Sequence, residues 1–235
     1  MLKDIGKYIF MIELGFKYID IFEKTFFHPF TTLKPAYKQL SIERQNYSNA
    51  VLEFLNVEVE MVGEIPTRDK ILYAINHRSL LDILVMENIF SKHEKSGTWI
   101  AKQDLFDHWL YGRFFRASGC MSVDLNNGKG LLTFFKKMKK TLSRVDDFNV
   151  YIFPEGERNK EKCVKEFQSG AAKIAKANKL DMVPVYIDDT LETVFQEAPF
   201  KEKKIVRVYV GDILNGTSLE DGYKELMKKA KSDCV

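Results

Sequence analysis

A histidine, a serine and an aspartate lie between two apolar runs in the segment ILYAINHRSLLDILVM, residues 71–86. Asp82 follows His77 by five residues, so its carboxylate could reach back over the loop and accept a hydrogen bond from one imidazole nitrogen. That bond would fix the tautomer and leave the other nitrogen as a general base. A capping box is the simpler interpretation, because Ser79 and Asp82 have its spacing, but it leaves His77 unexplained.

A second polar segment, FPEGERNK, follows the apolar stretch NVYIF. Gly156 would allow the backbone to approach a ligand closely, and the planar guanidinium of Arg158 suits a phosphate group. Glu155 is either a second acid or a brace for Arg158, and an ordinary polar turn is the plainer alternative. Lys102 ends the apolar segment TWIAK, where it is either a member of the same site or a surface lysine.

Strands and helices alternate from residue 56 onward, which indicates crossover connections and a mostly parallel sheet flanked by helices. The predicted strands are residues 56–62, 71–75, 98–102, 120–124, 149–153, 182–187 and 205–212. The predicted helices are residues 79–90, 104–117, 129–145, 166–177 and 218–231. In an α/β fold, ligand sites form at the carboxyl ends of the strands, so the polar loops around 76–79, 102–104, 124–128 and 154–158 are expected to converge.

The first 55 residues form a separate pattern, with apolar residues at helical spacing and charges between them. We predict two amphipathic helices, one ended by Pro29 and one over residues 35–55. Aromatic residues and lysines favour a position in a membrane interface, and covering the core is the alternative. The predicted division is therefore an N-terminal membrane-association element at 1–55 and an α/β domain at 56–235.

Composition narrows the classes of partner and cofactor. The chain has 36 basic and 33 acidic residues, a balance that does not favour nucleic acid. Its 3 cysteines and 4 histidines lack the spacing of zinc ligands, so we expect no metal. No apolar run approaches the roughly 18 residues of a spanning helix. We therefore expect peripheral contact with a membrane surface, at the cytoplasmic face of the cell membrane.

Several motifs together resemble the 1-acylglycerol-3-phosphate (lysophosphatidic acid) acyltransferases of the glycerolipid acyltransferase superfamily. NHRSLLD, residues 76–82, resembles the family's NHxxxxD motif, and FPEGERN, residues 153–159, resembles FPEGTRS with Glu157 in place of threonine. AKQDLF, FQSG and VPVYI, at 101–106, 167–170 and 183–187, resemble further family segments in the same order. The resemblance covers about residues 55–190.

This resemblance implies an O-acyltransferase that moves a fatty acyl chain from acyl-CoA or acyl carrier protein to the free hydroxyl of a lysophospholipid. His77 would be the general base and Asp82 would hold its ring, with no metal or cofactor. The substrate-binding residues would be Lys102, Glu155, Gly156 and Arg158.

One segment departs from the family pattern. GCMSVDL, residues 119–125, resembles GxxFIDR, but the arginine position holds Leu125. A hydrogen bond from a cation contributes about 1.5–3 kcal/mol, so phosphate binding should be weaker without it. Lysophosphatidic acid is the favoured acceptor, another lysolipid such as lyso-ornithine lipid is an alternative, and a non-catalytic peripheral lipid-binding module is the third interpretation.

Overall fold

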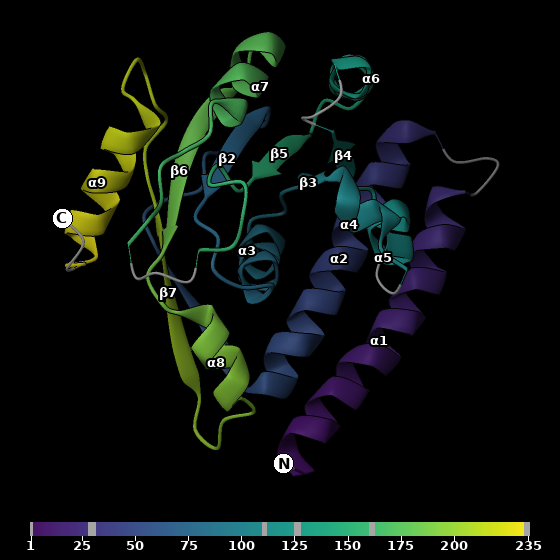
Figure 1. Cartoon of the computed structure of the whole chain (residues 1–235), viewed down its shortest axis with the longest axis vertical. Coiled ribbons are helices and arrows are strands. Elements are labelled where there is room, and N and C mark those ends of the chain that lie inside the picture. The colour runs from purple at the N-terminus through teal and green to yellow at the C-terminus, as the bar shows by residue number, and fades with distance from the viewer. Residues whose placement is uncertain (1, 28–31, 110–111, 125–127, 160–162, 233–235) are drawn as a thin grey trace.

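A seven-stranded sheet forms the centre of the molecule (Figure 1). The computed structural model describes residues 2–27, 32–109, 112–124, 128–159 and 163–232. The strands are β1 (Val57–Val62), β2 (Ile71–Ile75), β3 (Gly97–Lys102), β4 (Met121–Val123), β5 (Asn149–Ile152), β6 (Asp181–Ile187) and β7 (Lys204–Val210), in the order β1-β7-β6-β2-β5-β3-β4. Only the β6–β7 pair is antiparallel among the described strands, which confirms the mostly parallel sheet.

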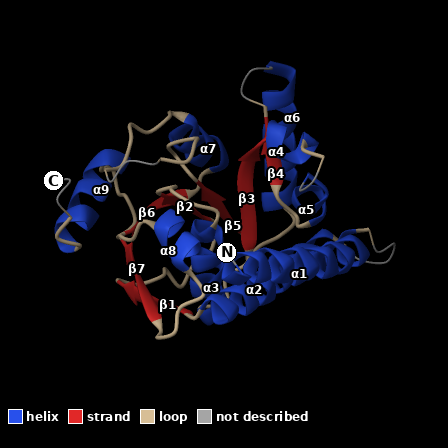
Figure 2. Ribbon diagram, turned by 60° about the horizontal axis from the view of Figure 1, so that its bottom comes forward, coloured by secondary structure: helices blue, strands red, loops and turns tan. Residues whose placement is uncertain are grey.

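Helices cover both faces of the sheet (Figure 2). One apolar core lies under α2 (Leu33–Leu55), α3 (Leu81–Lys92) and α8 (Leu191–Glu197). The other lies under α6 (Gly128–Leu142), α7 (Gly170–Asn178) and α9 (Leu219–Lys229). The central strands β2 and β5 are buried along their whole length, as expected for apolar strands between two helical layers.

The direction of the strands positions the site. Because β2, β3, β4 and β5 are parallel neighbours, their carboxyl ends lie at one edge of the sheet. The chain leaves this edge at Asn76 after β2, at Phe153 after β5 and at Asp124 after β4. Lys102 ends β3 there. The predicted convergence of these polar loops follows from this topology.

The two N-terminal helices are present, and their surroundings differ. In α2, Leu40, Val51 and Leu55 are fully buried, so this helix covers the core, as the alternative interpretation had it. Its Arg44 pairs with Glu87 of α3 across 2.7 Å, with both side chains buried. By contrast, α1 (Leu2–Phe26) packs on the outside and leaves a row of apolar side chains exposed, namely Ile5, Tyr8, Ile9, Ile12 and Phe16. The membrane role of residues 1–55 stays a prediction.

Two predicted helices differ most from the structure. Residues 104–117 form two short helices, α4 (Gln103–Asp107) and α5 (Gly112–Ala117), because His108 is extended at the end of α4. Helix α7 begins at Gly170 rather than near residue 166. The chain before it is held elsewhere, since the amide of Gln168 donates to the carbonyl of Pro154. The short helix α8 was not predicted.

Candidate functional site

His77 and Asp82 lie together at the start of α3. The imidazole Nδ1 is 2.8 Å from the Asp82 Oδ2, and only 14% of the histidine side chain and 2% of the aspartate side chain are exposed. Since β2 ends at Ile75 and α3 begins at Leu81, a short loop brings the ring over the first turn of the helix. With Nδ1 as the donor, Nε2 is left as the basic nitrogen, and no described residue bonds to it.

Asp82 also binds the loop before α3, but a complete capping box does not form, because the N-cap residue is Leu80 and it makes no side-chain cap bond. The backbone amides of Arg78 and Ser79 donate to the same Oδ2 atom, at 2.6 and 2.9 Å. The Ser79 hydroxyl accepts from the amide of Leu81 in return. The same Oδ2 atom thus contacts both the imidazole and the loop amides. Three hydrogen bonds on one oxygen hold the carboxylate in place facing the imidazole.

Glu155 joins the loop after β5 to the loop after β2. Its Oε1 accepts from the backbone amide of His77 at 2.8 Å, and its Oε2 accepts from the Asn159 side chain and the Lys165 amide, each at 3.0 Å. The residue is 3% exposed. Its carboxylate braces the backbone of His77 rather than Arg158, and direct substrate binding by Glu155 stays a prediction.

Gly156 provides the tight turn that the loop requires. Its φ is +71°, and an added Cβ would lie 2.6 Å from the side chain of Gln168. Its amide donates to the carbonyl of Phe153 at 3.0 Å, so this N–H is used within the turn. Gly156 therefore shapes the loop, and we assign no oxyanion contact to its amide.

Two exposed cations, Lys102 and Arg158, come from the edge of the sheet at which β3 and β5 end, and they are called the rim cations. The described residues offer neither side chain an ion-pair partner within 4.0 Å. Lys102 nevertheless lies near the loop after β5. The pKa of Glu157 is lowered chiefly by its hydrogen bond with Lys165, and the charge of Lys102 contributes a smaller attraction. Two exposed cations therefore lie at the edge of the sheet that also carries the loop of His77, and they could bind an anionic group.

Two aromatic residues of the site were missed in the sequence. The ring of Phe153 stacks on the His77 imidazole, with 3.7 Å between centroids and 11° between planes. Trp99 in turn stacks on Phe153, with 5.1 Å between ring centroids. Spacing along the chain gives no indication of either contact, since the three rings come from different strands and loops.

Part of the predicted site lies outside the described residues. Leu125, the position that departs from the family pattern, belongs to this part, as do the first residues of the NNGKG segment. Among the described residues, Asp124 marks the end of β4, and its side chain lies against Gly130 of α6, where an added Cβ would be 3.0 Å away.

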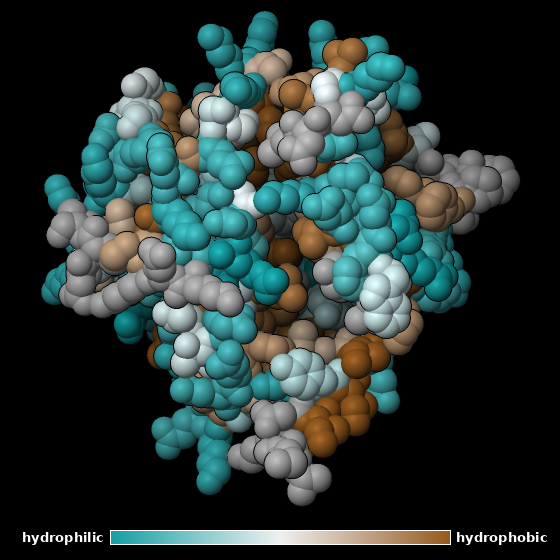
Figure 3. Space-filling model, in the orientation of Figure 1, coloured by the Kyte–Doolittle hydropathy of each residue, from teal (hydrophilic) through white to brown (hydrophobic). Residues whose placement is uncertain are grey.

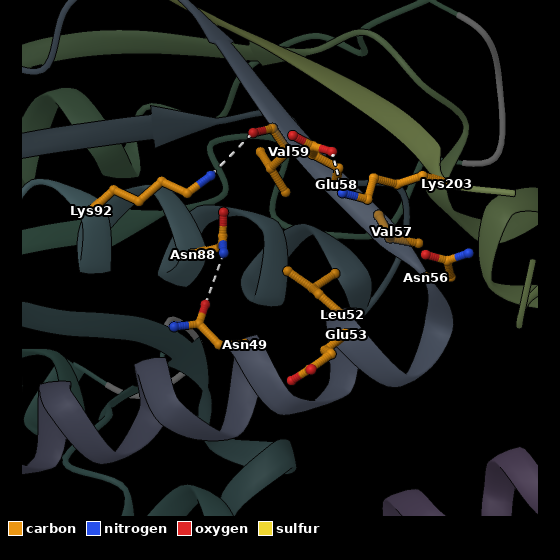
Figure 4. Close-up of a pocket in the computed structure, with 10 residues that line it drawn as sticks. All are labelled: Asn49, Leu52, Glu53, Asn56, Val57, Glu58, Val59, Asn88, Lys92 and Lys203. Atoms are coloured by element: carbon orange, nitrogen blue, oxygen red, sulfur yellow. Dashed lines mark hydrogen bonds and ion pairs between the residues drawn. The ribbon is translucent and has the colours of Figure 1, made fainter.

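A separate surface pocket lies between α2, α3 and β1 (Figure 4). Asn88 donates to Asn49 at 2.8 Å, and Lys203 pairs with Glu58 at 3.0 Å along its wall. Its lining residues are Asn49, Leu52, Glu53, Asn56, Val57, Glu58, Val59, Asn88, Lys92 and Lys203. Within the described chain, this pocket shares no lining residue with the His77 site.

Comparison with known proteins gives the family. A family model described as Acyltransferase matches residues 56–188, more than half of the chain. The chain belongs to the acyltransferase family. The matched region includes both loops of the site, so His77, Asp82 and Glu155 all lie within the acyltransferase domain.

Relatives of this acyltransferase come from distant organisms. It is 29% identical over 181 residues to the 1-acyl-sn-glycerol-3-phosphate acyltransferase of Helicobacter pylori, covering 74% of this chain and 73% of that protein. It is 25% identical over 167 residues to the chloroplastic enzyme of the same name from Arabidopsis thaliana, covering 69% of this chain and 45% of that one. The chain thus spans nearly three quarters of one relative and under half of the other.

A solved structure supports the fold of this acyltransferase. The 1-acyl-sn-glycerophosphate acyltransferase of Thermotoga maritima superposes with a TM-score of 0.60 at 17% identity, covering 97% of this chain and 94% of that one. The N-terminal helices fall within this coverage, so the likeness of fold extends beyond residues 56–188.

Proposed function

We propose that this acyltransferase moves an acyl chain from a thioester to the free hydroxyl of 1-acylglycerol-3-phosphate, which gives phosphatidic acid. The observation that carries the proposal is the buried contact between the His77 Nδ1 and the Asp82 carboxylate. The names of the relatives from Helicobacter pylori and Arabidopsis thaliana supply the substrate. The donor is acyl-CoA or acyl carrier protein.

The chemistry follows from the orientation of the imidazole. Nε2 of His77 removes the proton of the acceptor hydroxyl as its oxygen attacks the thioester carbonyl carbon. Asp82 holds the ring and stabilises the imidazolium that forms, as the carboxylate does in a hydrolase triad. The tetrahedral intermediate then collapses and the carbon–sulfur bond breaks. The imidazolium returns its proton to the thiolate, so the pair is regenerated without a covalent acyl-enzyme.

The rim cations would hold the acceptor. Arg158 lies in the loop that carries Glu155, Lys102 ends β3, and both are exposed, which supports a role in binding the phosphate of the headgroup. Arginine offers two parallel N–H donors and lysine a point charge, which together suit a phosphate monoester. This arrangement would compensate in part for Leu125.

We further propose that α1 carries the enzyme to the lipid substrate at the cytoplasmic face of the membrane. Ile5, Ile9, Ile12 and Phe16 are each at least half exposed and recur at helical spacing along one side. Figure 3 shows apolar side chains gathered at the lower right, where Figure 1 places the N-terminal part of α1. No described helix combines the length and apolar character that a membrane crossing requires.

A product assay tests this proposal against its rivals. Purified protein would be incubated with acyl-CoA or acyl carrier protein thioesters carrying a labelled chain, together with lysophosphatidic acid, lysophosphatidylcholine, lysophosphatidylethanolamine and lyso-ornithine lipid. The expected result is labelled phosphatidic acid by mass spectrometry. Labelled ornithine lipid instead would assign the alternative acceptor. Vesicle binding without any acylated product would support the non-catalytic lipid-binding module and refute the enzyme.

A further inference from the structure

We propose that Phe153 and Trp99 are positioning residues that fix the plane of the His77 imidazole, and that Glu87 anchors them to α3. The three stacked rings of His77, Phe153 and Trp99 are called the ring stack below. The inference concerns the proposed acyl transfer and rests on it, since it explains how the Nε2 atom is aimed at the acceptor hydroxyl.

A single hydrogen bond does not fix an imidazole. The contact between Nδ1 and Asp82 holds one atom of the ring, at 2.8 Å, but the ring can still turn about its side-chain torsions. The Phe153 ring lies parallel to it within 11°, at 3.7 Å between centroids. A turned imidazole would collide with this face. The bond and the stack together therefore set the direction in which Nε2 points.

Phe153 is itself held from behind. Trp99, which is 2% exposed, stacks on it at 5.1 Å and 26°. The indole Nε1 donates to Oε1 of Glu87 at 2.9 Å, which fixes the rotation of the tryptophan. Because interiors are closely packed, a ring held at both its face and its polar edge has little freedom.

The anchor lies on the same helix as the catalytic carboxylate. Asp82 is in the first turn of α3, and Glu87 is five residues further along it. Helix α3 therefore holds the imidazole in two ways, directly through Asp82 and indirectly through Glu87, Trp99 and Phe153. Both constraints move together if the helix moves.

Glu87 is fixed in turn by Arg44 of α2. The Arg44 Nε donates to the same Oε1 atom at 2.7 Å, and its two terminal nitrogens donate to the carbonyls of Ser118 and Gly97, each at 2.7 Å. Arg44 is buried, so this network is shielded from solvent and salt. The second N-terminal helix is thus part of the support for the catalytic ring.

The ring stack would also stabilise the positive charge that develops on His77 during the reaction. As His77 takes the proton, its ring becomes an imidazolium beside the negative face of an aromatic ring, an attractive arrangement. Leucine at position 153 would fill space without offering a flat face or a quadrupole. A leucine variant therefore separates the effect of the stack from the effect of a cavity.

Steady-state kinetics of Phe153→Leu, Trp99→Phe and Phe90→Leu test the inference. Phe90 is the matched control, because it is fully buried and stacks on Tyr151 in the same core without reaching His77. Misplacing a reacting group by about 1 Å costs up to about 100-fold in rate. We expect Phe153→Leu to lower kcat by about 10- to 100-fold with KM nearly unchanged. Trp99→Phe should lower kcat less, and Phe90→Leu should leave it within about twofold.

A second readout follows the ring without using activity. The chain has 4 histidines, so ¹⁵N-histidine NMR with His77→Gln as the reference identifies the His77 Nδ1–H signal. We expect Phe153→Leu to weaken or broaden this signal and Phe90→Leu to preserve it.

An unchanged Nδ1–H signal in Phe153→Leu, or equal kinetic losses in Phe153→Leu and Phe90→Leu, would overturn the inference. A wild-type protein that acylates no lysolipid would overturn the proposed function instead, and the NMR comparison would then show whether the stack orders the ring.

Discussion

The site has two halves that differ in how the protein holds them. In the inner half, His77, Asp82 and Glu155 are largely or fully buried, and each carboxylate accepts several hydrogen bonds from the protein. In the outer half, Lys102 and Arg158 are exposed. We therefore expect the two halves to act on different steps of the reaction. A preorganised inner half would act on the chemical step, and an outer half open to solvent would act on substrate binding.

Among the variants that test this comparison of the two halves, Asp82→Asn should lower kcat most. Asparagine keeps a side-chain oxygen that can accept from the Arg78 and Ser79 amides, so the loop and α3 should keep most of their stability. The amide cannot stabilise an imidazolium as a carboxylate does, and the wrong tautomer becomes accessible. We expect kcat to fall by about 100- to 10,000-fold at unchanged KM, measured by thiol release from the acyl donor. A rise in KM with kcat intact would place Asp82 in the binding half.

Glu155→Gln tests whether the brace belongs to the inner half. The substitution weakens charged hydrogen bonds to the His77 and Lys165 amides, so the free energy of unfolding should fall by about 2 kcal/mol. We also expect kcat to fall by about 10- to 100-fold, because the His77 backbone shifts.

Glu157→Gln is the matched control for that change. Glu157 lies two residues further along, and its pair with Lys165 is exposed, so its loss should leave the free energy of unfolding nearly unchanged. Chemical denaturation and kinetics on both variants measure the difference. Equal effects at the two positions would remove the distinction between a buried brace and a surface carboxylate.

Arg158→Ala tests whether the outer half acts on substrate binding. Loss of a cation that binds the headgroup should raise KM for the lysophospholipid about tenfold and leave kcat within about twofold. Lys102→Ala should act in the same direction and less strongly, since lysine lacks the bidentate geometry. Arg144→Ala, at an exposed arginine after α6, is the control. A fall in kcat with constant KM would move Arg158 into the chemical half.

The smallest expected effect is on membrane binding, which lies outside both halves. Ile9→Ser on α1 removes an isoleucine that is 50% exposed, and the lost burial in lipid, about 1 kcal/mol, should weaken vesicle binding about fivefold. Ile42→Ser on α2 is the control, because that side chain is 38% exposed on the neighbouring helix. Sedimentation with anionic vesicles measures both. Equal losses of vesicle binding in the two variants would show that the apolar row of α1 is not the membrane-binding surface.

Short sequence patterns predicted the features that depend on residues close together in the chain. The run ILYAI became β2 with the predicted bounds, because a continuous apolar run needs cover on both faces. The pairing of His77 with Asp82 was predictable as well, since it spans five residues across one loop. The break between α4 and α5 was not, because it depends on the extended conformation of His108 and on the close approach of Gly112 to α4, where an added Cβ would lie 2.4 Å from the carbonyl of Phe106.

Contacts between distant segments could not be predicted from one sequence. Glu155 was a plausible acid in a polar turn, but its bond to the His77 amide joins residues 78 positions apart. Arg44 was not singled out in the sequence, because its burial against Glu87 depends on the packing of α2 on α3. The side chains from distant segments that support His77 are therefore the part of the site that the structure adds.

The most direct test of the central claim is the rate of thiol release by His77→Ala with lysophosphatidic acid present, compared with the wild-type protein at equal folded concentration. We expect a loss of at least about 1,000-fold in kcat with no change in vesicle binding. A variant that retains wild-type acyl transfer would contradict it, because another group would then have to remove the proton of the acceptor hydroxyl.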